Sequence, residues 1–177
     1  MKKLSLILSV AVLLSIIFIS CKKEKKSEPE PTPTPNTQEF VADTNSFLNY
    51  MSWPIQSTKK GPSPSLGTAH VGNDTSVTRS VHFKDGQNAV NGKYPIGTII
   101  VKHSTNPAGS VNELTAMVKR GNNFNSSHGD WEFFMLNANG KIAKDASGNY
   151  MRGASLMGGM CGSCHNAASA KDYIFSK

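Results

Sequence analysis

The sequence predicts a β-rich α+β fold, in which an antiparallel sheet carries short peripheral helices and a cysteine-containing motif lies near the C-terminus. Three observations favour this class. Residues 75–83 alternate between apolar and polar side chains, which is the period of a half-buried strand. Residues 94–103 are β-branched through their middle, as strands commonly are. After Met151 the composition changes to small residues, which favours a tight loop that enters a helix.

The other elements can be placed in chain order. Asp43 or Thr44 is expected to cap a short helix that ends before Pro54. Its side chains at helical spacing are expected to pack in the core, namely Phe47, Leu48 and Met51. Residues 61–67 are rich in proline and serine and are predicted to form a loop.

Two more strands and a C-terminal helix complete this prediction. The strands span 113–118 and 131–136, and Asn139 and Gly140 supply a hairpin turn after the second one. The helix is short and is expected from about residue 161 to residue 173.

The N-terminus has the order of a secretory signal. Lys2 and Lys3 precede an uncharged apolar run over 4–19, which ends at small residues. A transmembrane helix needs about 20 apolar residues, and this run is shorter. Residues 17–21 resemble the lipobox of bacterial lipoproteins, in which the cysteine becomes the lipidated first residue of the mature chain. We therefore expect a signal peptide over 1–20, lipid attachment at Cys21, and export to a periplasm-facing or outer-membrane location, held to the membrane by the lipid anchor.

The segment that follows is predicted to be a tether. Residues 22–39 contain no large apolar side chain and have prolines at alternating positions, so they favour extended conformations. A semi-rigid tether over 21–39 then leads to one domain over 40–177, which is an ordinary size for a domain. Basic residues outnumber acidic ones in this domain but are spread along the chain, which argues against nucleic-acid binding.

The motif near the C-terminus is Cys161, Gly162, Ser163, Cys164 and His165, the Cys-X-X-Cys-His spacing of covalent haem attachment. One helical turn sets the two thiols to reach the two vinyl groups of one porphyrin, and the adjacent imidazole is then directed at the iron. We therefore predict one covalent haem c, attached through Cys161 and Cys164, with His165 as the iron ligand. A structural zinc or a redox disulfide are the alternatives, and neither accounts for His165.

The second side of the iron is predicted to be open. No methionine follows His165, where the familiar small cytochromes place a second iron ligand. A five-coordinate iron that binds small ligands is therefore favoured. The upstream methionines are assigned to core or loop packing: Met117, Met135, Met151, Met157 and Met160. Two other hypotheses remain, a periplasmic electron-transfer cytochrome c and a haem-free lipoprotein with a disulfide.

Four segments occur in the order found in one family. Residues 69–83, 94–103, 129–136 and 161–175 resemble successive motifs of the cytochrome P-460 and cytochrome c'-beta family. The resemblance covers roughly residues 44–177 and implies a β-rich, homodimeric haem protein. Members of the P-460 branch oxidise hydroxylamine, and the c'-beta branch binds nitric oxide. The resemblance thus implies a small nitrogen-oxide ligand or substrate and a redox partner protein.

The resemblance also points to individual residues. In the P-460 members a lysine of the motif Gly-Thr-X-X-X-Lys cross-links to the porphyrin, and the matching residue here is Lys102; an exposed strand lysine is the alternative. A carboxylate above the iron serves proton transfer in the oxidising members, and ungapped counting from Trp131 places that position at Thr115. Threonine is no base of comparable strength, and Glu113 lies two residues away on the same side of the strand. Hydroxylamine oxidation is therefore left open.

Five further polar residues were weighed for roles near the iron. Arg79 falls on the apolar side of its strand, either as a paired core arginine or as a donor in the distal pocket, on the iron side opposite His165. The remaining histidines show no ligand spacing and are assigned surface or packing roles: His70, His82, His103 and His128.

Overall fold

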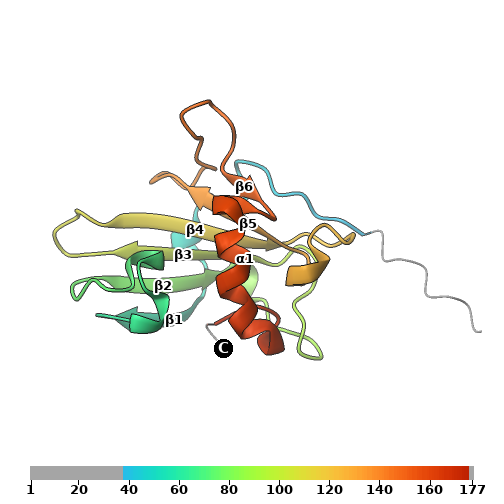
Figure 1. Ribbon diagram of the computed structural model, residues 1–177, viewed down its shortest axis with the longest axis horizontal. Helices are drawn as coiled ribbons and strands as arrows, with labels where there is room; N and C mark the ends of the chain where they lie inside the picture. The colour runs from blue at the N-terminus through green and yellow to red at the C-terminus, as the bar shows by residue number, and fades with distance from the viewer. Residues whose placement is uncertain (1–37, 176–177) are drawn as a thin grey trace, which may run out of the picture. The chain divides into compact units, whose positions relative to one another are not determined.

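The computed structural model describes residues 38–175, whose main feature is a six-stranded antiparallel sheet with the strand order β1-β2-β3-β4-β5-β6 (Figure 1). Each strand pairs with its neighbour along the chain. The strands are β1 (Ile55–Lys60), β2 (Thr78–Phe83), β3 (Ile99–Thr105), β4 (Asn112–Lys119), β5 (Trp131–Leu136) and β6 (Arg152–Gly153). The β-rich antiparallel fold is confirmed.

Helical structure in the described residues is short. The α-helix α1 spans Met160–His165. The 3-10 turns are η1 (Tyr50–Ser52), η2 (Pro64–Leu66), η3 (Ala69–Val71), η4 (Lys84–Gly86), η5 (Ser126–His128), η6 (Leu156–Gly159) and η7 (Asn166–Lys171). None of the helices within 38–175 has the length and apolar character needed to cross a membrane. The predicted signal peptide, Cys21 and nearly all of the predicted tether lie outside the described residues.

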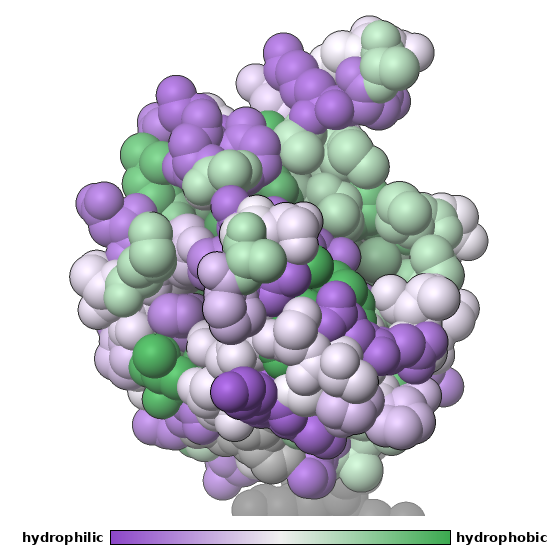
Figure 2. Space-filling model, turned by 90° about the vertical axis from the view of Figure 1, so that its left-hand side faces the viewer, coloured by the Kyte–Doolittle hydropathy of each residue, from purple (hydrophilic) through white to green (hydrophobic). Residues whose placement is uncertain are grey.

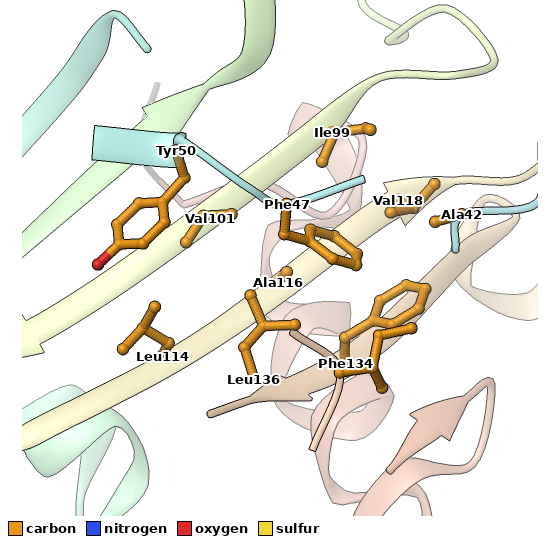
Figure 3. Packing of buried hydrophobic residues seen from close by; sticks show 11 residues of the cluster. Ala42, Phe47, Tyr50, Ile99, Val101, Leu114, Ala116, Val118, Phe134 and Leu136 are labelled. Carbon is orange, nitrogen blue, oxygen red and sulfur yellow. The ribbon is translucent and has the colours of Figure 1, made fainter. Parts of the chain in front are cut away.

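The sheet separates two hydrophobic clusters. On one face, Phe47 and Tyr50 pack on side chains of the central strands, and the ring centroids of Phe47 and Phe134 are 5.0 Å apart. Figure 3 shows this cluster on the near side of the sheet and the C-terminal helix on the far side. The other face carries Phe83, Ile100 and Phe133, and α1 crosses in front of it in Figure 1. We call this second side the α1 face.

The strand predictions were correct for the centre of the sheet and inexact at its margins. β5 has the predicted bounds, and β4 is longer than predicted by one residue at each end. β3 begins only at Ile99, because Pro95 and Gly97, with a φ of 89°, form a turn before it. The predicted turn at 139–140 is present and leads to an isolated bridge between Leu136 and Ile142.

The predicted helix after Asp43 was wrong. The carboxylate of Asp43 accepts hydrogen bonds from the Asn45 amide and the Ser46 hydroxyl, which makes a local turn, and Asn49 has a left-handed φ of 60° that a helix does not tolerate. Only the 3-10 turn η1 follows. Of the expected core residues, Phe47 is fully buried, whereas Leu48 and Met51 are exposed.

The C-terminal helix is shorter than predicted. It ends at His165, and a 3-10 stretch continues to Lys171. Ala168 has a non-helical φ of −106°, and Asp172 and Tyr173 have left-handed φ values of 51° and 67°. These two residues turn the chain back toward α1, which has a direct consequence for His165.

Candidate functional site

Helix α1 carries the three residues of the attachment motif. Gly159 precedes the helix with a φ of 86°, a conformation that glycine adopts without steric cost. Cys161 and Cys164 are three residues apart and therefore lie on the same side of the helix. Both are free thiols and partly buried, and burial raises the pKa of Cys161.

Gly162, between the two cysteines, allows a close approach of another loop. A Cβ atom at this position would lie 2.9 Å from the ring of His128. The Nδ1 of His128 lies 3.1 Å from both the Asn125 side-chain oxygen and the Ser127 hydroxyl. His128 therefore packs under the helix, in agreement with the packing role expected for it.

The imidazole of His165 is oriented by a backbone carbonyl. Its Nδ1 lies 2.7 Å from the carbonyl oxygen of Tyr173, and because a carbonyl only accepts, Nδ1 carries the proton. Burial lowers the pKa of His165 to about 4, so the ring is neutral at pH 7 and Nε2 keeps its lone pair. Metal-binding histidines commonly have their second nitrogen held in this way.

Apolar rings surround the same imidazole. The ring centroids of Phe133 and Phe175 lie 5.6 Å and 5.4 Å from that of His165. Two thiols on one helical turn, an adjacent imidazole with an available Nε2, and aromatic walls are the donor set and environment that a c-type haem requires. The residues of the motif thus fit the group that the sequence predicts.

The carbonyl that orients His165 belongs to a firmly held segment. The Nζ of Lys119 donates to both carboxylate oxygens of Asp172, at 2.7 Å and 2.8 Å, and both side chains are buried. The backbone amide of Tyr94 donates to the same carboxylate at 2.8 Å, and the indole of Trp131 donates to the Asp172 carbonyl, also at 2.8 Å. These contacts fix the residue that immediately precedes Tyr173.

Lys102 and Thr115, which were singled out from the sequence, are direct partners across β3 and β4. Lys102 is two residues from Ile100 and Thr115 is two residues from Met117, so both lie on the α1 face. The pKa of Lys102 is lowered to about 8, chiefly by burial and also by the charge of Arg79, while the charge of Glu113 opposes the shift. A partly neutral amine therefore lies on the sheet face that α1 covers.

Arg79 is buried and holds the loop before its own strand. Its Nη1 donates to the carbonyl of Val71 at 3.1 Å, and its Nη2 donates to the carbonyl of Gly61. Its Nε is buried without a hydrogen-bond partner among residues 38–175. The guanidinium thus has the contacts of a paired core arginine, the first of the two roles considered for it.

His70 is the residue that sequence reasoning missed at this site. Its ring centroid lies 6.5 Å from that of His165, with the two planes at 89°. Its Nδ1 is 3.3 Å from the Thr115 hydroxyl and 3.4 Å from a carboxylate oxygen of Glu113. No spacing in the sequence relates these residues, since the turn η3, the strand β4 and the helix α1 bring them together.

The other two histidines lie on the opposite face. His103 Nδ1 is 2.9 Å from the hydroxyl of Tyr50, and His82 is buried with its ring against the same tyrosine. Burial lowers the pKa of His82. Both have the packing roles that the sequence analysis assigned to them. Among the methionines, Met157 and Met160 are exposed, in contrast to the packing expected for them.

Comparison with known proteins gives one match. A family model described as Cytochrome P460 matches residues 48–176, which include all six strands of the sheet and the helix α1. The comparisons with curated proteins and with solved structures found no match.

Proposed function

The chain belongs to the cytochrome P460 family of c-type haem proteins, and we propose that it binds or oxidises small nitrogen species such as nitric oxide and hydroxylamine. The observation that carries this proposal is the arrangement around His165. Its Nδ1 is satisfied by the Tyr173 carbonyl, its Nε2 is available to an iron, and Lys102 and Thr115 lie on the neighbouring sheet face.

The proposed cofactor is one haem, attached covalently. Each thiol, Cys161 and Cys164, adds across one vinyl group to form a thioether, and no group is lost. His165 would supply a nitrogen ligand to the iron. When bound, the haem supplies an iron that accepts a small ligand and changes its oxidation state by one electron. The protein contributes the orientation of the imidazole by the Tyr173 carbonyl and the exclusion of water by the buried ring of Phe133.

Lys102 is proposed to lie against the porphyrin edge and to be linked to it. The lowered pKa of Lys102 supports this role, because only the neutral amine has a lone pair with which to form a bond. The link would join Nζ to a ring carbon as one N–H and one C–H bond break, and the two protons and two electrons released would reduce a peroxide to water. A linked ring is distorted, and distortion is one means by which proteins tune haem.

Thr115 sets the expected balance between binding and turnover. Oxidation of hydroxylamine requires the removal of protons, and a hydroxyl group is a weak acceptor at neutral pH. General-base catalysis commonly contributes about 100- to 10,000-fold. We therefore propose that the protein binds nitrogen ligands well and oxidises hydroxylamine slowly, passing electrons to a redox partner protein.

The proposal extends to the position of the domain in the cell. A lipid on Cys21 and an extended tether would hold the haem domain at an exported, periplasm-facing or outer-membrane surface. The family relationship further supports a homodimer.

Absorption spectra test the proposed function. The protein is matured with the c-haem attachment machinery, and spectra are recorded oxidised and reduced, with and without nitric oxide or hydroxylamine. We expect a five-coordinate reduced iron whose spectrum changes on addition of either ligand. A six-coordinate low-spin spectrum that responds to neither ligand, and that shifts on substitution of one methionine, would instead identify an electron-transfer cytochrome.

A further inference from the structure

His70 lies in the 3-10 turn η3, between β1 and β2, far in sequence from the attachment motif. Its ring is nevertheless 6.5 Å from the ring of His165, measured between centroids. Metal–nitrogen bonds to imidazole are about 2 Å long, so an iron bound to His165 on the side that faces His70 would lie close to the His70 ring.

The backbone of His70 is held in an unfavourable conformation. His70 and Val71 have left-handed φ values of 51° and 54°, a conformation that is sterically costly for a residue other than glycine. Such strain persists only where surrounding contacts impose it, and it concentrates at functional sites. Here the contacts are Arg79 Nη1 on the Val71 carbonyl at 3.1 Å and Ser104 Oγ on the His70 carbonyl at 3.4 Å.

Of the two ring nitrogens of His70, Nδ1 lies beside Thr115 and Glu113 of β4, and Nε2 makes no hydrogen bond to residues 38–175. Glu113 Oε1 lies 3.4 Å from Nδ1 and is buried, with no hydrogen bond of normal geometry among residues 38–175. A carboxylate only accepts, and it therefore favours the tautomer in which Nδ1 carries the proton. The hydroxyl of Thr115, 3.3 Å from Nδ1, has both donor and acceptor capacity and permits the same tautomer. In this tautomer Nε2 is an acceptor.

We propose that His70, held by Glu113, is the ligand-contacting residue on the open side of the iron and that its Nε2 accepts a hydrogen bond from the bound ligand. The inference rests on the proposed function and specifies its ligand class: nitrogen ligands that carry N–H or O–H groups, such as hydroxylamine, are favoured over nitric oxide, which carries none.

Ligand affinities of the ferric haem-loaded protein test this proposal. Hydroxylamine, without an electron acceptor, and nitric oxide are titrated by absorption into wild type and His70→Leu. We expect His70→Leu to weaken hydroxylamine binding about threefold to tenfold, the worth of one hydrogen bond, and to leave nitric oxide binding within about twofold. Glu113→Leu removes the carboxylate that favours the tautomer protonated at Nδ1. Its hydroxylamine affinity should lie between those of wild type and His70→Leu. His103→Leu, on the opposite face of the sheet, is the control and should change neither affinity.

His70→Asn is a second variant that keeps the proposal testable if His70→Leu fails to fold. Asparagine tolerates the left-handed conformation of residue 70 but is too short to replace the ring, so His70→Asn should fold and still lose the preference for hydroxylamine. Equal affinity changes for both ligands, or none, would overturn the inference and leave the proposed function intact. A low-spin wild type that becomes high-spin in His70→Leu would also overturn it, because His70 would then bind the iron itself. A wild type that binds neither ligand would refute the proposed function instead.

Discussion

At the residue scale, the sequence alone predicts Cys161, Cys164 and His165 as the haem-attachment residues, because their spacing matches the chemistry of one porphyrin. The orientation of His165 was not predictable, because the Tyr173 carbonyl reaches it only through two consecutive left-handed residues. His70 was not predictable either, since its contacts come from a strained loop turn and from the neighbouring strand residues of β4.

The residue that limits turnover is expected to be Thr115. Thr115→Glu introduces a carboxylate beside Lys102, at the position that ungapped counting from Trp131 matches to the base of oxidising members. We expect hydroxylamine oxidation to rise by about 100-fold or more, within the usual range for a general base. Thr115→Gln has nearly the same shape without a base and is the control. Steady-state turnover with an electron acceptor measures the effect, and equal rates for the two variants would contradict the assignment.

Lys102 should make stability depend on pH in protein produced without haem. Its pKa is about 8 in the folded chain and 10.5 in the unfolded chain. Between these values the unfolded chain binds more protons, so the free energy of unfolding rises with pH across this window, by up to about 1.4 kcal/mol for each unit between the two pKa values. Below pH 8 the cost of burying the cation is fully present.

Denaturant titrations between pH 7 and pH 11 measure this dependence, with the window fixed by the pKa values of Lys102. Lys102→Met should remove the rise, whereas Lys141→Met, at an exposed hairpin turn, should retain it. The same rise in Lys102→Met as in wild type would mean that another group titrates there.

At the scale of elements, strands with apolar alternation or β-branched cores were predictable, and β4 and β5 matched closely. β1 was missed because its sequence, IQSTKK, is almost wholly polar, as suits an edge strand with only β2 as its neighbour. The C-terminal helix was predicted to reach residue 173, whereas α1 ends at His165 and Ala168 has a non-helical φ of −106°. The left-handed turn at Asp172 that follows depends on Lys119 of β4, a contact that the local sequence does not show.

The buried ion pair between Lys119 and Asp172 is expected to stabilise this turn. Lys119→Met leaves the Asp172 carboxylate buried without its counter-charge, a loss that typically costs about 3–5 kcal/mol. Because Asp172 adjoins the carbonyl that orients His165, the same variant should also shift the haem reduction potential. Denaturant titration and redox titration measure the two effects.

Lys144→Met is the control for this pair. Lys144 is exposed and lies over the ring of Tyr150, so its loss should change stability by no more than about 0.5 kcal/mol and leave the potential unchanged. A Lys119→Met protein as stable as wild type, with an unaltered potential, would show that the segment at 172–173 is fixed by other contacts.

At the scale of the whole described domain, each strand pairs with its neighbour along the chain. The two hydrophobic clusters lie on opposite faces of the sheet. One closes the face away from α1, and the other packs against the segment that carries Cys161. Strongly hydrophobic residues appear only in small areas between hydrophilic ones on the side shown in Figure 2. The antiparallel class was predictable from strand periodicity. Which residues of different strands share one face could be established only from the register of strand pairing in the structure.

Cellular fractionation should reveal the proposed anchor. Cys21→Ser removes the acceptor for the lipid, and a chain without acyl groups has no stable hold on a bilayer. We expect the wild type in the membrane fraction and Cys21→Ser in the soluble exported fraction, with an unchanged haem spectrum. A Cys21→Ser protein that still sediments with membranes would contradict the lipoprotein assignment.

The central claim is that the chain carries covalent haem at Cys161, Cys164 and His165. Denaturing gels stained for haem peroxidase activity test it directly, because thioether-linked haem stays with the chain and non-covalent haem is lost. After maturation with the c-haem machinery, the wild type should give a stained band, and the double variant Cys161→Ala, Cys164→Ala should give none at equal protein load. A wild-type chain that is exported and folded but never stains would contradict the account.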